Sequence, residues 1–150
     1  MTEDPTKIAY LAGLFDGEGS IYGGVDPRTG LHITCIMGPP EALKLFHEAF
    51  GGSLKLYRPT GNQKTAAWRW SLHGAIKQEA FLAKVFPWLI IKKAQAELAL
   101  QYVQTVRKKG SSLTPTKEVI ELRTLIIRSL SELNCKKGRN SSRKPVKEGD

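Results

Sequence analysis

The chain has 150 residues, a formal net charge of +9 and 41% hydrophobic residues. This size fits one domain with a substantial core. No apolar run approaches the ~20 residues of a membrane span, and the acidic N-terminus is unlike a secretion signal, so we expect neither a membrane protein nor a secreted one. The basic charge favours a polyanionic partner, most often nucleic acid, over a small-molecule substrate.

The first predicted helix begins at Asp4 and Pro5, a helix cap followed by a residue suited to the first turn. It carries two apolar stripes at helical spacing. One stripe consists of Ile8, Leu11, Ala12 and Phe15, and the other of Tyr10, Gly13, Leu14 and Gly17. A glycine inside a helix costs about 1 kcal/mol relative to alanine. The second stripe therefore predicts very close packing of another helix.

Two predicted hairpins and further helices follow. Residues 20–25 and 31–36 alternate polar and apolar side chains around a turn, and a helix is expected from Pro40 to Phe50. A second hairpin uses residues 54–57 and 67–72. Helices are then expected over about 75–86, 92–108 and 114–133. The order indicates an α+β fold, with four antiparallel strands and helices on one face.

The C-terminal segment differs in composition from the rest. Residues 135–150 are rich in Lys, Arg, Ser and Gly without apolar periodicity, which predicts a basic disordered tail after a single domain over residues 1–134. Cys35 and Cys135 lie far apart in the sequence, so no disulfide and a reducing compartment are expected.

Residues 11–19, LAGLFDGEG, closely resemble the LAGLIDADG motif of the homing endonucleases. Residues 87–96 resemble the family's second characteristic stretch, in which a proline and apolar residues precede a lysine at a helix start. The resemblance implies an αββαββα fold with a saddle-like four-stranded antiparallel sheet, helices on one face and additional C-terminal helices. It also implies a metal-dependent DNA endonuclease.

The resemblance assigns chemistry to a few residues. Glu18 matches the acidic metal ligand, and Gly17 supplies the backbone carbonyl before it. Lys92 matches the active-site lysine, although Lys93 is an alternative. Asp16 is interpreted as a structural carboxylate. The implied cofactor is Mg²⁺, and Mn²⁺ or Ca²⁺ could occupy the same site because hard cations take oxygen ligands. The polar residue that the family often carries after the second strand is absent near Met37.

The glycine stripe has two interpretations. The sequence contains one copy of the motif, so a like helix packed on Tyr10, Gly13, Leu14 and Gly17 would come from a second subunit of a homodimer. The alternative is another helix of the same chain.

DNA recognition is expected on the solvent face of the strands, because a β-ribbon fits the major groove. Alternation nominates polar or small residues on this face and in its two turns. They are Tyr22, Gly24, Asp26, Arg28, His32, Thr34, Lys55, Tyr57, Arg58, Asn62, Gln63, Lys64 and Arg69. A dimer would cover a pseudo-palindromic site of about 20 base pairs.

The favoured function is a homodimeric homing endonuclease that makes a staggered double-strand break in DNA and so promotes intron or intein homing. The alternative is a non-cleaving nucleic-acid-binding protein on the same fold, either an intron RNA maturase or a transcriptional regulator. Scarce Asn and abundant Ala and Gly favour the cytoplasm of a prokaryotic or phage host over an organelle.

Overall fold

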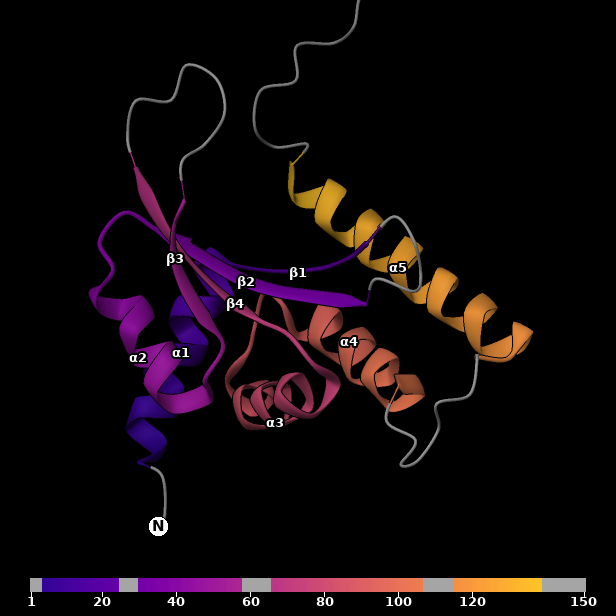
Figure 1. Cartoon of the computed structure of the whole chain (residues 1–150), viewed down its shortest axis with the longest axis horizontal. Coiled ribbons are helices and arrows are strands. Elements are labelled where there is room, and N and C mark those ends of the chain that lie inside the picture. The colour runs from indigo at the N-terminus through magenta and orange to yellow at the C-terminus, as the bar shows by residue number, and fades with distance from the viewer. Residues whose placement is uncertain (1–3, 25–29, 58–65, 107–114, 139–150) are drawn as a thin grey trace, which may run out of the picture.

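A computed structural model describes residues 4–24, 30–57, 66–106 and 115–138 of the chain (Figure 1). The elements follow the predicted order. They are α1 (Pro5–Glu18), β1 (Gly19–Gly23), β2 (Leu31–Met37), α2 (Glu41–Phe50), β3 (Ser53–Tyr57), β4 (Ala67–Leu72), α3 (Ala75–Val85), the short 3₁₀ helix η1 (Phe86–Trp88), α4 (Lys93–Val106) and α5 (Lys117–Gly138). The predicted αββαββα order with C-terminal helices is confirmed.

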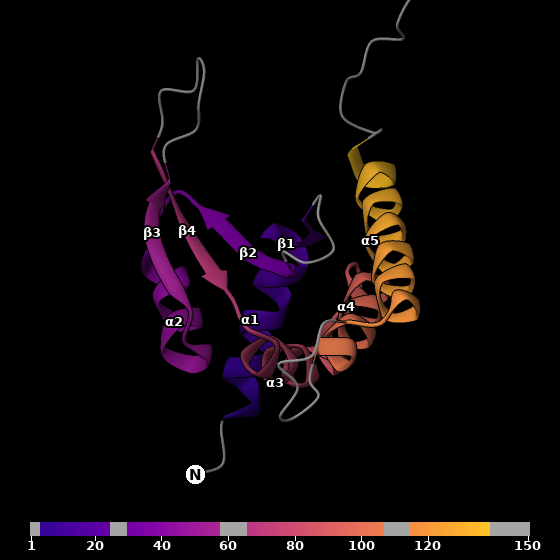
Figure 2. The ribbon, with the colours of Figure 1, turned by 45° about the vertical axis from the view of Figure 1, so that its right-hand side comes forward.

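The four strands form one antiparallel sheet in the order β1-β2-β4-β3. Helices α1 to α4 lie on one face of this sheet, and α5 runs beside the edge strand β1 (Figures 1 and 2). The register pairs Gly19 with Cys35 and Tyr22 with His32 across β1 and β2. It pairs Lys55 with Arg69 across β3 and β4. No helix among the described residues covers the opposite face of the sheet.

Helix α1 starts as the sequence predicts. Asp4 is the N-cap and accepts a hydrogen bond from the Thr6 amide through its side chain, and Pro5 occupies the first turn. The helix ends at Glu18 because Gly19 is extended and begins β1 without a connecting loop. The end of α1 is therefore fixed directly to the edge of the sheet.

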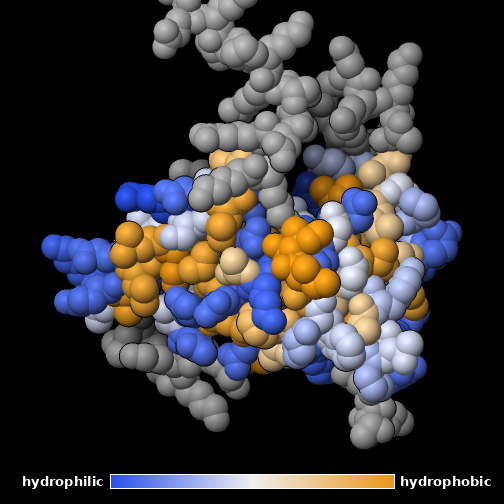
Figure 3. Space-filling model, turned by 180° about the vertical axis from the view of Figure 1, so that it is seen from behind, coloured by the Kyte–Doolittle hydropathy of each residue, from blue (hydrophilic) through white to orange (hydrophobic). Residues whose placement is uncertain are grey.

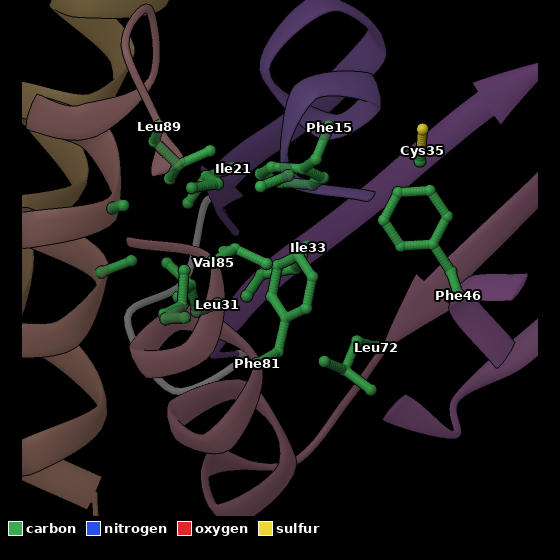
Figure 4. Packing of buried hydrophobic residues seen from close by; sticks show 14 of the residues in the cluster. Phe15, Ile21, Leu31, Ile33, Cys35, Phe46, Leu72, Phe81, Val85 and Leu89 are labelled. Carbon is green, nitrogen blue, oxygen red and sulfur yellow. The ribbon is translucent and has the colours of Figure 1, made fainter. Parts of the chain in front are cut away.

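The core lies between the sheet and the helices (Figure 4). Phe81 of α3 is at its centre and makes edge contacts with Phe15 of α1 and Trp70 of β4. The buried amide of Gln78 donates hydrogen bonds to the carbonyls of Leu31 and Leu72, which secures α3 to two neighbouring strands. These contacts set the position of α1 under the sheet.

Helix α5 extends beyond its expected end. It continues to Gly138, so residues 135–138 are helical although the sequence assigned them to the disordered tail. The helix is secured to the sheet edge by Ile127, which packs against Gly23, and by the Asn134 amide, which donates to the Ile21 carbonyl. Residues 139–150 of the predicted tail lie outside the described residues.

Gly19 should not tolerate a side chain. A Cβ at this position would overlap the Phe15 ring and lie 2.6 Å from the Phe15 carbonyl oxygen. We expect Gly19→Ala to lower the free energy of unfolding by about 2 kcal/mol through overpacking. Urea unfolding would measure this loss. Gly38→Ala is the control, because a Cβ at Gly38 has no heavy atom within 4 Å. An unfolding midpoint equal to that of the control would contradict the expectation.

Candidate active site and nucleic-acid interface

The carboxylate of Asp16 joins two helices that are far apart in the sequence. It accepts hydrogen bonds from the backbone amides of Ile90, Ile91 and Lys92 at 2.8–3.0 Å. These amides precede the first turn of α4, so Asp16 caps the positive end of that helix from 76 residues away. The structural role expected for Asp16 is therefore observed, but its partners are distant in sequence.

The environment of Asp16 favours the ionised form. Burial opposes ionisation, but the hydrogen bonds from Ile91, Lys92 and Ile90 together with the charge of Lys92 outweigh it and lower the pKa of Asp16 below its ordinary value. Asp16 therefore contributes stability above its unfolded-state pKa, and that contribution is lost as the pH falls through its folded-state pKa.

The Lys92 side chain returns to α1. Lys92 is buried, and its Nζ donates a 2.7 Å hydrogen bond to the backbone carbonyl of Asp16. The neighbouring Lys93 is exposed, and its Nζ lies over the Phe86 ring, 5.2 Å from the centroid. Of the two lysines that the sequence left open, the structure brings Lys92 to the end of α1.

Glu18 is exposed at the last position of α1, beside exposed Gly17. The charge of Glu18 influences the pKa of a buried thiol nearby. Burial is the largest cause that raises the pKa of the Cys35 thiol to about 12. The charge of Glu18 raises this pKa further, whereas the charge of Lys92 lowers it. The charges of Glu18 and Lys92 therefore both act on the same buried thiol. Sequence reasoning did not include Cys35 in the site; its pairing with Gly19 across the sheet places it there.

The donor chemistry of this site suits a hard divalent cation. The Glu18 carboxylate and the Gly17 carbonyl are oxygen donors of the kind that Mg²⁺ and Ca²⁺ prefer. Within the described part of the chain, no three His, Cys, Asp or Glu side chains are grouped closely enough to hold a metal ion. One copy of the chain thus offers part of a coordination shell, and further oxygens would have to come from DNA, water or a second copy.

The glycine face of α1 is open. Gly13 and Gly17 are exposed, and a Cβ at either position would have no heavy atom within 4 Å. Tyr10 on the same face is 54% exposed, and Leu14 is half-buried. No helix in the described part of the chain packs on these glycines, so the intramolecular alternative is not supported. Ile90 and Ile91, whose amides bind Asp16, are also exposed.

Apolar groups gather on the face of the molecule seen from behind (Figure 3). Tyr10, Trp88, Ile90 and Ile91 are among the exposed large hydrophobic residues of the chain, and they belong to α1 or to the segment that precedes α4. Exposed apolar side chains that gather on one surface often mark an interaction site.

The uncovered sheet face carries rows of polar side chains. One row crosses Tyr22, His32 and His73, and another places Arg69 of β4 opposite Lys55 of β3. Lys55 is exposed, and the Arg69 guanidinium lies over the Tyr57 ring, 4.2 Å from the centroid. Thr34 shares this face but is only 5% exposed, so it offers little surface to a ligand.

Some predicted DNA contacts cannot be placed. Gly24 is described and directly follows β1, whereas Asp26, Arg28, Arg58, Asn62, Gln63 and Lys64 lie outside the described residues. Sequence alternation also missed His73, because this residue follows β4 and joins the row only through the strand register.

The fold can be compared with solved structures. The homing endonuclease I-CvuI, in complex with the I-CreI target in the presence of Mg, superposes with a TM-score of 0.68 at 21% identity, covering 85% of this chain and 82% of that one. The chain has the homing-endonuclease fold. I-CvuI with its own target and Ca gives 0.65 at 19% identity, covering 86% and 82%.

A second homing endonuclease, the archaeal intron-encoded I-Vdi141I complexed with DNA, gives a TM-score of 0.66 at 18% identity, covering 99% of this chain and 91% of that one. No family model matches the sequence, and no curated protein matches it significantly. No helix among the described residues is long and apolar enough to cross a membrane.

The Asp16 contact is testable by a one-atom exchange. Asp16→Asn removes the charge and one acceptor oxygen, so we expect the free energy of unfolding to fall by about 2–3 kcal/mol near neutral pH. The difference from wild type should shrink as the pH drops below about 4, where Asp16 becomes protonated in the unfolded chain. Chemical unfolding at several pH values measures it. Asp4→Asn is the control, since Asp4 is exposed and caps only its own helix. A pH-independent difference would argue against the role of the charge.

Proposed function

We propose that this chain is a DNA endonuclease of the homing type that works as a homodimer with Mg²⁺. The observation that carries the proposal is the exposed Glu18 at the end of a helix whose glycine face is open, with Lys92 held at the same helix end by Asp16. The shared fold with DNA-bound homing endonucleases supports this assignment.

A two-fold axis along the open face of α1 accounts for its composition. Glycines let two helix backbones approach closely, and the exposed Tyr10, Ile90 and Ile91 would become buried in the same contact. Glu18 directly follows Gly17, so the axis would bring the two Glu18 carboxylates together. Two carboxylates in one place repel each other unless a cation lies between them.

The proposed chemistry is hydrolysis of one phosphodiester bond in each strand. Glu18 and the Gly17 carbonyl would hold Mg²⁺, which supplies Lewis-acid stabilisation of the phosphate charge and a water of lowered pKa. Lys92 carries a positive charge at the same helix end, where it can stabilise the negative charge that develops on the phosphate. The Cys35 thiol, with its raised pKa, stays protonated and adds no charge.

Duplex DNA would bind the uncovered sheet face. Lys55 and Arg69 are positive and can contact phosphates or guanine edges, while Tyr22 and His32 offer donors and acceptors for base edges. The homodimer would read a pseudo-palindrome of about 20 base pairs. Cleavage at such a site in an allele lacking the insertion would promote intron or intein homing.

The central test is Glu18→Gln. We expect DNA cleavage with Mg²⁺ to fall by about 10²-fold or more, while the affinity for DNA stays within about threefold of wild type. The substrate is a duplex in which the two DNA stretches that flank the gene are joined directly, as in an allele without the insertion. The nicked and linear products are quantified. Glu48→Gln, at an exposed position on α2, is the matched control.

If Glu18→Gln cuts at the wild-type rate, the assignment of Glu18 is wrong. If the wild-type protein binds this DNA but never cuts it with Mg²⁺ or Mn²⁺, the chain is a non-cleaving binding protein, such as a maturase or a regulator.

The dimer is tested by Gly13→Ala. Within one chain this change fills open space and favours the helix, so the free energy of unfolding of the monomer should rise by about 0.5–1 kcal/mol. At a helix–helix contact the added methyl groups would separate the backbones, and the dimer dissociation constant should rise about tenfold or more. Sedimentation measures the constant, with Gly38→Ala as control. An unchanged dissociation constant contradicts the proposed contact.

A further inference from the structure

Three aromatic side chains form a row across the uncovered sheet face. Tyr22 of β1 stacks on His32 of β2, with ring centroids 5.0 Å apart and an interplanar angle of 16°. His73, which follows β4, meets His32 edge-on with centroids 6.0 Å apart. His73 is exposed, and Tyr22 is 39% exposed, so the row is open to solvent.

The row joins two titratable imidazoles. Burial lowers the pKa of His32 below its ordinary value, and the nearby His73 lowers it further. In the free protein, adding a proton to one ring therefore opposes adding a proton to the other. His32 consequently favours its neutral form near neutral pH.

The charged and titratable groups of the described neighbouring elements are placed by the strand register and the side-chain contacts. Tyr22 is the titratable group of β1 in the row. On β4, Arg69 shares the face but lies four residues before His73. Strand β3 pairs with β4 only as far as Ser71 and does not reach His73. Helix α5 meets β1 through Ile127 and Asn134, which are uncharged.

We propose that His32 and His73 form a proton-coupled contact with duplex DNA, in which the imidazoles become protonated as an acceptor group of the DNA docks on the Tyr22–His32–His73 row. The acceptor is a phosphate oxygen or the O6 and N7 edge of a guanine, which present the same chemistry to an imidazolium. This inference rests on the proposed binding of DNA to the sheet face, and it adds His73 to that surface.

The physical reason is linkage. A negative charge or acceptor beside the pair favours the protonated rings and offsets their mutual repulsion. DNA binding then takes up protons, so affinity must rise as the pH falls, by up to about tenfold per pH unit for each proton taken up. Burial and the neighbouring His73 lower the pKa of His32 in the free protein, so its proton uptake on binding is larger than that of an isolated exposed histidine.

The experiment measures the dissociation constant of the full-length protein for a mixed-sequence duplex of about 30 base pairs, at constant ionic strength, between about pH 5.5 and about pH 8. We expect affinity to rise about tenfold or more towards the acidic end. The double variant His32→Gln, His73→Gln should lose most of this slope, and each single variant part of it. His47→Gln, at an exposed position on α2, should keep the full slope.

The outcomes separate this inference from the proposed function. A slope on both the mixed-sequence duplex and the duplex flanking the gene supports a phosphate contact. A slope on the flanking duplex alone supports a guanine contact. Tight binding with no slope, or a slope that the double variant retains, overturns the inference and leaves the endonuclease proposal intact. Absence of DNA binding at every pH overturns both.

Discussion

The candidate site depends on two oppositely charged side chains, each of which binds backbone groups at the end of the other helix. The C-terminus of α1 and the N-terminus of α4 meet, and each end carries unpaired backbone groups of opposite polarity. The Asp16 carboxylate satisfies the amides that precede α4, and the Lys92 ammonium satisfies a carbonyl at the end of α1. Each helix thus supplies the counter-charge for the other, which fixes Lys92 and the start of β1 relative to each other.

This arrangement explains why Glu18 and Lys92 can share a site although they are far apart in the sequence. Glu18 is two residues after Asp16, and Lys92 is one of the residues whose amides Asp16 binds. No loop intervenes at the α1 end, because Gly19 enters the sheet at once. Any displacement of Asp16 would therefore alter the Glu18–Lys92 geometry before it altered the rest of the core.

The sequence predicted those features that depend on local pattern. Helical spacing indicated the two stripes of α1, and alternation indicated four strands and the outward face of Lys55 and Arg69. It could not predict features that depend on register or long-range pairing. His73 and Cys35 enter their clusters only because specific strand positions are paired. The end of α5 was misplaced because its last turn has a tail-like composition.

The uncovered sheet face has features that work against stability in the free chain. Arg69 and Lys55 are opposite one another, and like charges at such a pair are destabilising. The buried Arg69 Nε makes no hydrogen bond within the described residues, which also has a cost. A polyanion on this face would supply negative charge beside Lys55 and Arg69 and so offset their repulsion. The like charges on this face are thus a cost to the free chain that the proposed binding of DNA would offset.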